Sequence, residues 1–170
     1  APVPPGVPGA PAAPPAWSAT GAPPPAPAWG SPTPAVAGPP VGPVDPHGLG
    51  AAATRLGGSA RKHARVALAV AGAALADGEV VEVAVGGRFE GNPAVLVLTS
   101  TGLLLADERQ WKPVVERFPV DAGLQIQGWQ DDRTASLTIV TGGRQLVVDG
   151  IADRPLAVEL AQRVRYRIGG

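Results

Sequence analysis

The second half of the chain alternates hydrophobic and polar positions over short segments that turn residues separate, which is the pattern of half-buried strands. Val81, Val83 and Val85 fall on one face of the first segment, and Gly86-Gly87 is predicted to end it. Strands at this regular spacing are typical of an antiparallel sandwich or barrel. Seven strands are predicted, at residues 79–85, 94–99, 103–107, 114–118, 123–129, 135–141 and 144–149.

The most hydrophobic stretch of the chain is "NPAVLVLTSTGLLLADE", residues 92–108. It predicts a hairpin of two aliphatic strands joined through Ser100-Thr101-Gly102, and it is too interrupted to cross a bilayer. Its first strand is apolar on both faces. One face should line the core, whereas the other needs a cover, which is either a helix of this chain or a partner protein.

Helices are predicted on both sides of the strands. An Ala-rich segment at residues 60–76, with Ser59 as its N-cap, gives an N-terminal helical region of residues 59–77, and this helix is the candidate cover of the hairpin. A second helix closes the chain, and Asp153 is predicted to cap it. Its apolar stripe consists of Leu156, Leu160, Val164 and Ile168.

The composition of the first part of the chain is different. Residues 1–54 hold 17 of the 21 prolines and one formal charge, Asp45. Such a segment buries too little apolar surface to offset its ordering entropy, so it is predicted to be a disordered Pro/Ala/Gly-rich tail. Two similar motifs, "PPAW" ending at Trp17 and "APAW" ending at Trp29, are candidate docking points for a partner protein. The alternative is a linker in which the tryptophans have no role.

The net charge of the chain and its few reactive side chains exclude several classes of function. The 14 Lys and Arg balance 14 Asp and Glu, so no net field attracts nucleic acid and no nucleic-acid partner is expected. The chain has no cysteine, which excludes a disulfide framework, a thiolate metal site and a cysteine nucleophile, and which suits a cytoplasmic setting. With only two histidines, we expect no metal site and no cofactor.

The sequence also contains no recognisable set of catalytic residues. Ser100 has no G-x-S-x-G elbow around it, so a turn hydroxyl that bonds to the backbone is the simpler interpretation. Asp131-Asp132 stands next to Arg133 and is interpreted as a solvated hairpin tip, rather than as a cation site. The protein is therefore expected not to be an enzyme.

The order of the predicted elements, seven strands and then one amphipathic helix, resembles that of the pleckstrin-homology (PH) superfold. Locally, the chain is similar to bacterial PH-like domains in "LADGEVVEVAVGGRF", "AVLVLTSTGLLLADE", "VERFPVDAGLQIQG" and "ASLTIVTGGRQLVVDGI". The resemblance implies a mainly β, α+β fold at residues 78–170, a partly open seven-stranded antiparallel barrel with a C-terminal capping helix. The chain departs from these families at residues 99–102, where they often carry a charged turn.

PH domains that hold phosphoinositides use Lys and Arg of the first hairpin and second strand. The matching positions here, residues 86–99, offer Arg88 alone, next to Glu90, so specific phosphoinositide binding is not expected. A basic stripe on the Ala-rich helix is a candidate for weak contact with anionic membranes, and a solvated outer face is the alternative. The stripe consists of Arg55, Arg61, Lys62 and Arg65.

Two tryptophans of the strand region are candidate anchors for a protein partner. Trp111 stands in the sequence beside Lys112 and close to Arg109, and alternation places Trp129 on the outer face of its strand. The alternative is that the N-terminal helix or a sister subunit covers that face and makes it ordinary core.

The favoured function is a non-catalytic PH-like module that binds an unidentified protein partner, with the tail as a spacer or second docking element. Two alternatives stay open at this point. One is peripheral binding to anionic membrane lipids, and the other is self-assembly into a homo-oligomer. Because PH-like folds host unrelated functions, the fold by itself does not choose among them.

Overall fold

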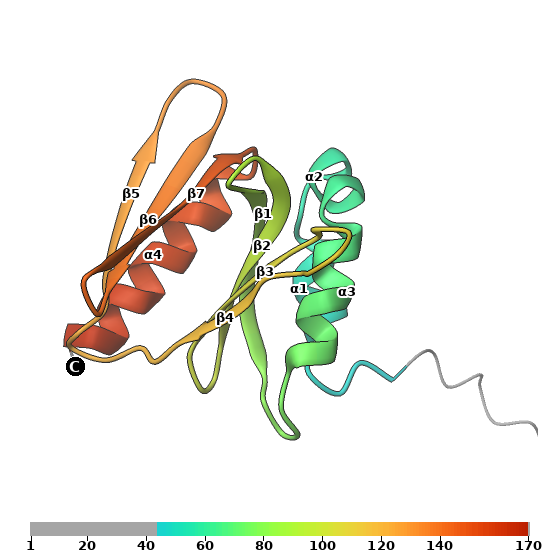
Figure 1. Ribbon diagram of the computed structural model, residues 1–170, viewed down its shortest axis with the longest axis horizontal. Coiled ribbons are helices and arrows are strands. Elements are labelled where there is room, and N and C mark those ends of the chain that lie inside the picture. The colour runs from blue at the N-terminus through green and yellow to red at the C-terminus, as the bar shows by residue number, and fades with distance from the viewer. Residues whose placement is uncertain (1–43, 170) are drawn as a thin grey trace, which may run out of the picture. The chain divides into compact units, whose positions relative to one another are not determined.

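The computed structural model describes residues 44–169, and Figure 1 shows the path of the chain through them. The helices are α1 (Leu49–Thr54), α2 (Gly58–His63), α3 (Arg65–Ala74) and α4 (Arg154–Gly169). The strands are β1 (Val81–Phe89), β2 (Asn92–Thr99), β3 (Leu103–Asp107), β4 (Val115–Phe118), β5 (Gln125–Gln130), β6 (Ala135–Thr141) and β7 (Arg144–Ile151). Trp17 and Trp29 lie outside the described residues.

The seven strands form one open antiparallel sheet in the order β4-β3-β2-β1-β7-β6-β5, so β4 and β5 are its two edges. Strand β1 joins the two halves of the sheet. It pairs with β2 along its length, and its last residues, Arg88 and Phe89, pair with β7. Helix α4 packs on β5, β6 and β1, while α3 packs on β2, β3 and β4 (Figure 1). The predicted fold, PH-like in its general shape, is confirmed.

The predicted strands are all present, but Gly86-Gly87 does not end β1. Both glycines lie inside the strand because other segments approach its backbone there. A Cβ on Gly87 would lie 2.7 Å from the Asp149 carbonyl oxygen of β7, and one on Gly86 would lie 3.2 Å from the Cβ of Ala64. The glycines therefore mark the place where the two halves of the sheet and the helical layer meet.

The region predicted as one helix, residues 59–77, is split in the structure, and helical structure begins earlier than predicted. Helix α1 lies within residues 1–54, the range predicted as tail. The break between α2 and α3 falls at Ala64, whose side chain is buried against Gly86 of β1. Here tertiary packing overrides the helix propensity of an Ala-rich run.

The predicted helix caps are also used differently. Gly57, rather than Ser59, precedes α2, and its N–H donates to both carboxylate oxygens of Asp153 at 3.1 Å. The Asp153 side chain therefore serves α2, whereas the N–H groups of Leu156 and Ala157 in α4 donate to the Asp153 carbonyl oxygen. Asp153 thus fastens the N-terminal helical layer to the start of the C-terminal helix.

Helix α3 covers the second face of the central hairpin, as predicted for the Ala-rich segment. Its buried residues are Ala67, Leu68 and Ala71, and it packs on both β2 and β3. Residues 94–98 are accordingly buried on both faces of β2. The cover of this apolar strand is part of the chain itself, so the hairpin is core and does not offer a binding surface.

Candidate functional site

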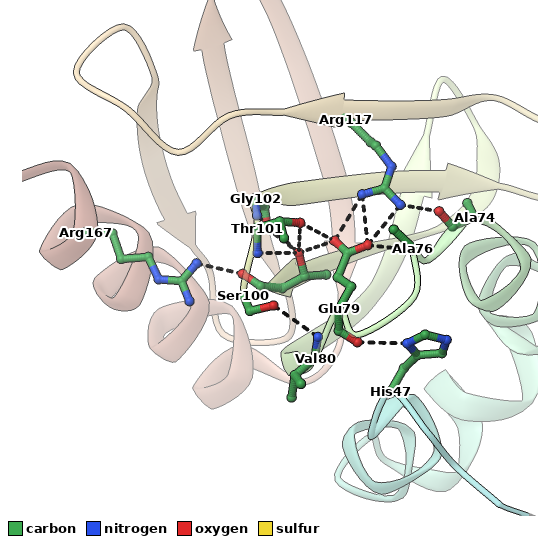
Figure 2. Close-up of polar contacts among 11 residues, drawn as sticks. His47, Ala74, Ala76, Glu79, Val80, Ser100, Thr101, Gly102, Arg117 and Arg167 are labelled. Carbon is green, nitrogen blue, oxygen red and sulfur yellow. Dashed lines mark hydrogen bonds and ion pairs between the residues drawn. The ribbon is translucent and has the colours of Figure 1, made fainter.

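The carboxylate of Glu79, in the turn between α3 and β1, is buried and joins three parts of the fold (Figure 2). It accepts hydrogen bonds from the Thr99 Oγ1 at 2.5 Å, the Thr101 Oγ1 at 2.6 Å and the Ala76 N–H at 2.9 Å. The Arg117 guanidinium of β4 donates to both carboxylate oxygens at 3.0 Å. We call Glu79, Thr99, Thr101 and Arg117 the Glu79 clasp. It ties the end of α3 to the β2–β3 turn and to β4.

Burial on its own would raise the pKa of Glu79, because it disfavours the charged form. The hydrogen bonds from Thr101, Thr99, the Ala76 N–H and Arg117 together outweigh burial and lower the pKa to about 2. A general acid or base needs a pKa near the working pH. The Glu79 clasp is therefore suited to holding the fold together, and not to proton transfer at neutral pH.

The clasp also accounts for the hydroxyl-rich turn between β2 and β3. The Thr99 Oγ1 accepts a hydrogen bond from the Gly102 N–H at 3.1 Å, and the Ser100 Oγ accepts one from the Val80 N–H at 3.1 Å (Figure 2). These hydroxyls satisfy backbone groups and the buried carboxylate, which is the ordinary use of such residues in turns.

Asp131 holds the tip of the β5–β6 hairpin. Its Oδ1 accepts hydrogen bonds from the N–H groups of Thr134 at 2.6 Å and Arg133 at 2.7 Å. The hydrogen bond from the Thr134 N–H lowers the pKa of Asp131 most, and the bond from the Arg133 N–H lowers it further. Among residues 44–169, no group of three or more His, Cys, Asp or Glu side chains is placed to hold a metal ion.

The structure brings Arg109, Trp111 and Lys112 together in the β3–β4 connection, where they line one open hollow. The Trp111 side chain is 97% exposed. Arg109 forms an ion pair with Glu90 and a second with Asp107, whose Oδ2 lies 2.7 Å from the Arg109 Nε. Its charge is thus used inside the fold, which leaves Trp111 and Lys112 as the parts of this surface that face solvent.

The structure divides the predicted basic stripe. Arg55, just after α1, forms an ion pair with Glu159 of α4, and this bond lowers the pKa of Glu159. Arg61, Lys62 and Arg65 are exposed on α2 and at the start of α3, and they form no ion pair within the described part of the chain. Three of the four predicted residues therefore form an exposed basic surface.

Strand β5 presents polar backbone groups at an open edge of the sheet. The β5–β6 hairpin closes with a bond from the Asp131 N–H to the Thr134 carbonyl oxygen at 2.9 Å. Bonded and non-bonded pairs alternate along an antiparallel ladder, so every second residue of β5 directs its N–H and C=O groups away from β6. These residues are Ile126, Gly128 and Gln130, and we call their backbone groups the β5 edge row.

A hollow of about 140 Å³ lies beside the β5 edge row, between the β5–β6 hairpin and α4. It exists because the residues that face each other there are small. Gly128 has no side chain, and Ala157 and Ala161 of α4 contribute only methyl groups. An apolar cavity of about 150 Å³ holds one benzene molecule. We call this space the α4–β5 hollow, and its size is that of one apolar side chain.

Trp129 stands next to the α4–β5 hollow and is 66% exposed. Leu124 and Ile126 are buried, so the predicted outward orientation of Trp129 is confirmed. Trp111 and Trp129 line separate hollows, and the structure therefore does not combine the predicted anchors into one surface.

The other edge strand, β4, is poorly suited to pairing with a further strand. It has four residues and lies between Pro113 and Pro119, and short strands and flanking prolines protect sheet edges. Strand β5 has six residues without a proline. Of the two edges, β5 is the one that can accept another strand over a useful length.

Sequence reasoning found Trp129 but missed the α4–β5 hollow and Arg165, which also lines it. A weak signal was present, because Gly128 interrupts a strand and Ala157 and Ala161 stand four residues apart on a helix. Only the fold shows that these small residues face one another.

A scan against models of protein families finds no match to this chain, and neither does a search of curated proteins or of solved structures. Membership of a bacterial PH-like family therefore stays a prediction, although the general shape of the fold is PH-like. No helix among residues 44–169 is long and apolar enough to cross a membrane.

Proposed function

We propose that this protein is a non-catalytic protein-binding module that takes up an extended segment of a partner protein as an added strand on β5. The observation that carries this proposal is the β5 edge row, which lies directly beside a hollow sized for one side chain. Backbone pairing would supply affinity and the hollow would supply selectivity, as in other cases of strand addition.

The geometry of the edge decides where the side chains of an added strand point. The residue of the added strand that lies opposite Gly128 directs its side chain to the same, inner face of the sheet. This side chain would enter the α4–β5 hollow. The residue of the added strand that lies opposite Trp129 directs its side chain to the outer face, where it would pack beside the indole ring. Full burial of one aliphatic or aromatic side chain contributes about 1.5–3 kcal/mol, to which backbone hydrogen bonds add about 0.5–1.5 kcal/mol each.

The volume of the hollow favours a side chain over a free small molecule. Pockets for drug-sized ligands measure about 300–1,000 Å³, whereas the α4–β5 hollow measures about 140 Å³. The Pro/Ala/Gly-rich segment that precedes the described residues is proposed as the tether of the module, with Trp17 and Trp29 as second docking points. The partner itself is unidentified.

Trp129→Ala is expected to weaken peptide binding by up to about fivefold, since an aromatic cross-strand pair contributes about 0.2–1 kcal/mol. The probes are extended peptides of about ten residues, the length of a long strand, selected from a random displayed library on the whole chain. Isothermal titration gives the Kd of each selected peptide.

Trp111→Ala is the matched control, because it removes another exposed tryptophan from a different surface. Its Kd should equal that of the unchanged protein. The proposal is wrong if Trp111→Ala abolishes binding while Trp129→Ala has no effect, or if no extended peptide binds. Pairing of β5 with a second copy would use the same row, and light scattering of the free protein separates this self-assembly from partner binding.

A second candidate function is contact with anionic membranes, which the exposed, unpaired side chains of Arg61, Lys62 and Arg65 within the described residues favour. Each base near an anionic surface contributes about 1 kcal/mol. Co-sedimentation with phosphatidylserine vesicles should then fall as salt is raised, and it should disappear in the double variant Arg61→Glu/Lys62→Glu. Binding that salt does not change, or that this variant retains, excludes this candidate.

A further inference from the structure

Arg165 of α4 is placed to influence which partner segments can pair with the β5 edge row. It is the one charged residue that lines the α4–β5 hollow. Its Nε donates a hydrogen bond to the Ile126 carbonyl oxygen at 3.3 Å. Since Ile126 belongs to the β5 edge row, Arg165 occupies a backbone acceptor that an added strand would use.

The neighbouring arginines of the same helix are neutralised, and Arg165 is not. Arg163 and Arg167 both form ion pairs with Glu82. Within residues 44–169, no carboxylate lies at ion-pairing distance from Arg165. The binding surface therefore holds a positive charge whose present partner is only a carbonyl oxygen, at a distance near the weak end of the hydrogen-bond range.

We infer that Arg165 selects partner segments that carry an acidic side chain next to the apolar residue in the hollow. This inference rests on the proposed function. In the bound state, an N–H of the added strand takes the Ile126 carbonyl oxygen, and the released guanidinium pairs with the partner's carboxylate. A guanidinium presents its N–H donors as a planar fork that matches a carboxylate in two parallel hydrogen bonds, which a neutral amide side chain does not reproduce.

The same contact has a use in the free protein. An open edge strand is a template for unwanted pairing, and charged side chains at the edge oppose it. Arg165, lying over the Ile126 end of the β5 edge row, protects that end until a segment with a compensating negative charge arrives. A neutral segment would displace the guanidinium without giving it a new partner.

The test is a double-mutant cycle between Arg165 and the acidic residue of the peptide. Selected peptides are prepared with acetylated and amidated ends, so that only a side chain supplies a carboxylate, and each is compared with its Asp→Asn or Glu→Gln counterpart. On the unchanged protein, removal of the acid should weaken binding about threefold to fivefold, as for an exposed ion pair. On Arg165→Gln the two peptides should bind equally, and on Arg165→Lys part of the difference should return.

Arg163→Gln is the control, because this arginine lies on the same helix but already forms ion pairs with Glu159 and Glu82. It should retain the full preference for the acidic peptide, and raised salt should reduce that preference on the unchanged protein. An equal preference on the unchanged protein and on Arg165→Gln overturns the inference and leaves the proposed function standing. Failure of every peptide, acidic or neutral, overturns both.

Discussion

Glu79→Gln is expected to lower the free energy of unfolding by about 3 kcal/mol at neutral pH. Glutamine has the shape of a protonated glutamate, so this change removes the charge and keeps the volume. The folded protein lowers the pKa of Glu79 from 4.5 to about 2, and one pKa unit corresponds to about 1.4 kcal/mol. The loss arises because Thr99, Thr101 and Arg117 then donate to a neutral amide oxygen, or lose their acceptor.

The same pKa shift predicts the dependence on pH. A carboxyl group whose pKa is lower in the folded state contributes its full stability above its unfolded pKa, near 4.5, and loses it as the pH falls toward 2. The difference between the unchanged protein and Glu79→Gln should therefore be constant near neutrality and shrink between these two pH values. Urea unfolding followed by far-ultraviolet circular dichroism at a series of pH values measures this difference.

Glu116→Gln is the matched control, because Glu116 is a carboxylate on β4 whose ion pair with Arg144 lies near the surface. An exposed pair contributes about 0–1 kcal/mol, so this variant should lose much less stability. If the two variants are equally stable at neutral pH, or if the Glu79→Gln difference is unchanged in acid, the Glu79 clasp does not have the role assigned to it.

The second large effect is expected for Gly128→Val, which should weaken peptide binding about tenfold to a hundredfold. A valine side chain at this position occupies the α4–β5 hollow and excludes the partner's apolar residue, whose burial is worth about 1.5–3 kcal/mol. The fold should tolerate the change. A Cβ on Gly128 would lie 3.5 Å from the Leu137 Cδ2, an ordinary contact, and valine favours strands.

Gln127→Val is the control for Gly128→Val, since it places the same side chain on the outer face of the same strand. It should leave the Kd of a selected peptide nearly unchanged. Both variants should unfold at urea concentrations no lower than the unchanged protein. Equal loss of binding in both variants, or in neither, would show that the hollow does not receive a partner side chain.

The seven strands and the C-terminal helix could be predicted because local patterns specify them. Apolar residues alternate or recur at helical spacing there, and turn residues separate the segments. Gly86-Gly87 was misinterpreted because a glycine pair is also a turn signal, and its true cause is the approach of Asp149 and Ala64 from distant parts of the chain. The break at Ala64 has the same origin, since only packing on β1 distinguishes this alanine from its neighbours.

In the candidate site, too, local patterns could be predicted from the sequence, whereas contacts between distant residues could not. Alternation along β5 was enough to place Trp129 on the outer face. The partner of Arg55, by contrast, stands 104 residues away, so the sequence placed this arginine in an exposed stripe although Glu159 holds it. The α4–β5 hollow arises from residues on β5 and α4 that are unremarkable singly, and their pairing requires the folded structure.

Amide hydrogen exchange of β5, followed residue by residue by NMR with and without a selected peptide, tests the central claim most directly. The N–H groups of Gly128 and Gln130 point away from β6, so they should exchange rapidly in the free protein and become protected when an added strand accepts their hydrogen bonds. The backbone N–H of Trp129 already forms a hydrogen bond within the β5–β6 hairpin, so its exchange rate should change little. Binding that leaves the Gly128 and Gln130 amides unprotected, and instead shifts the signals of Trp111 and Lys112, would contradict strand addition at β5.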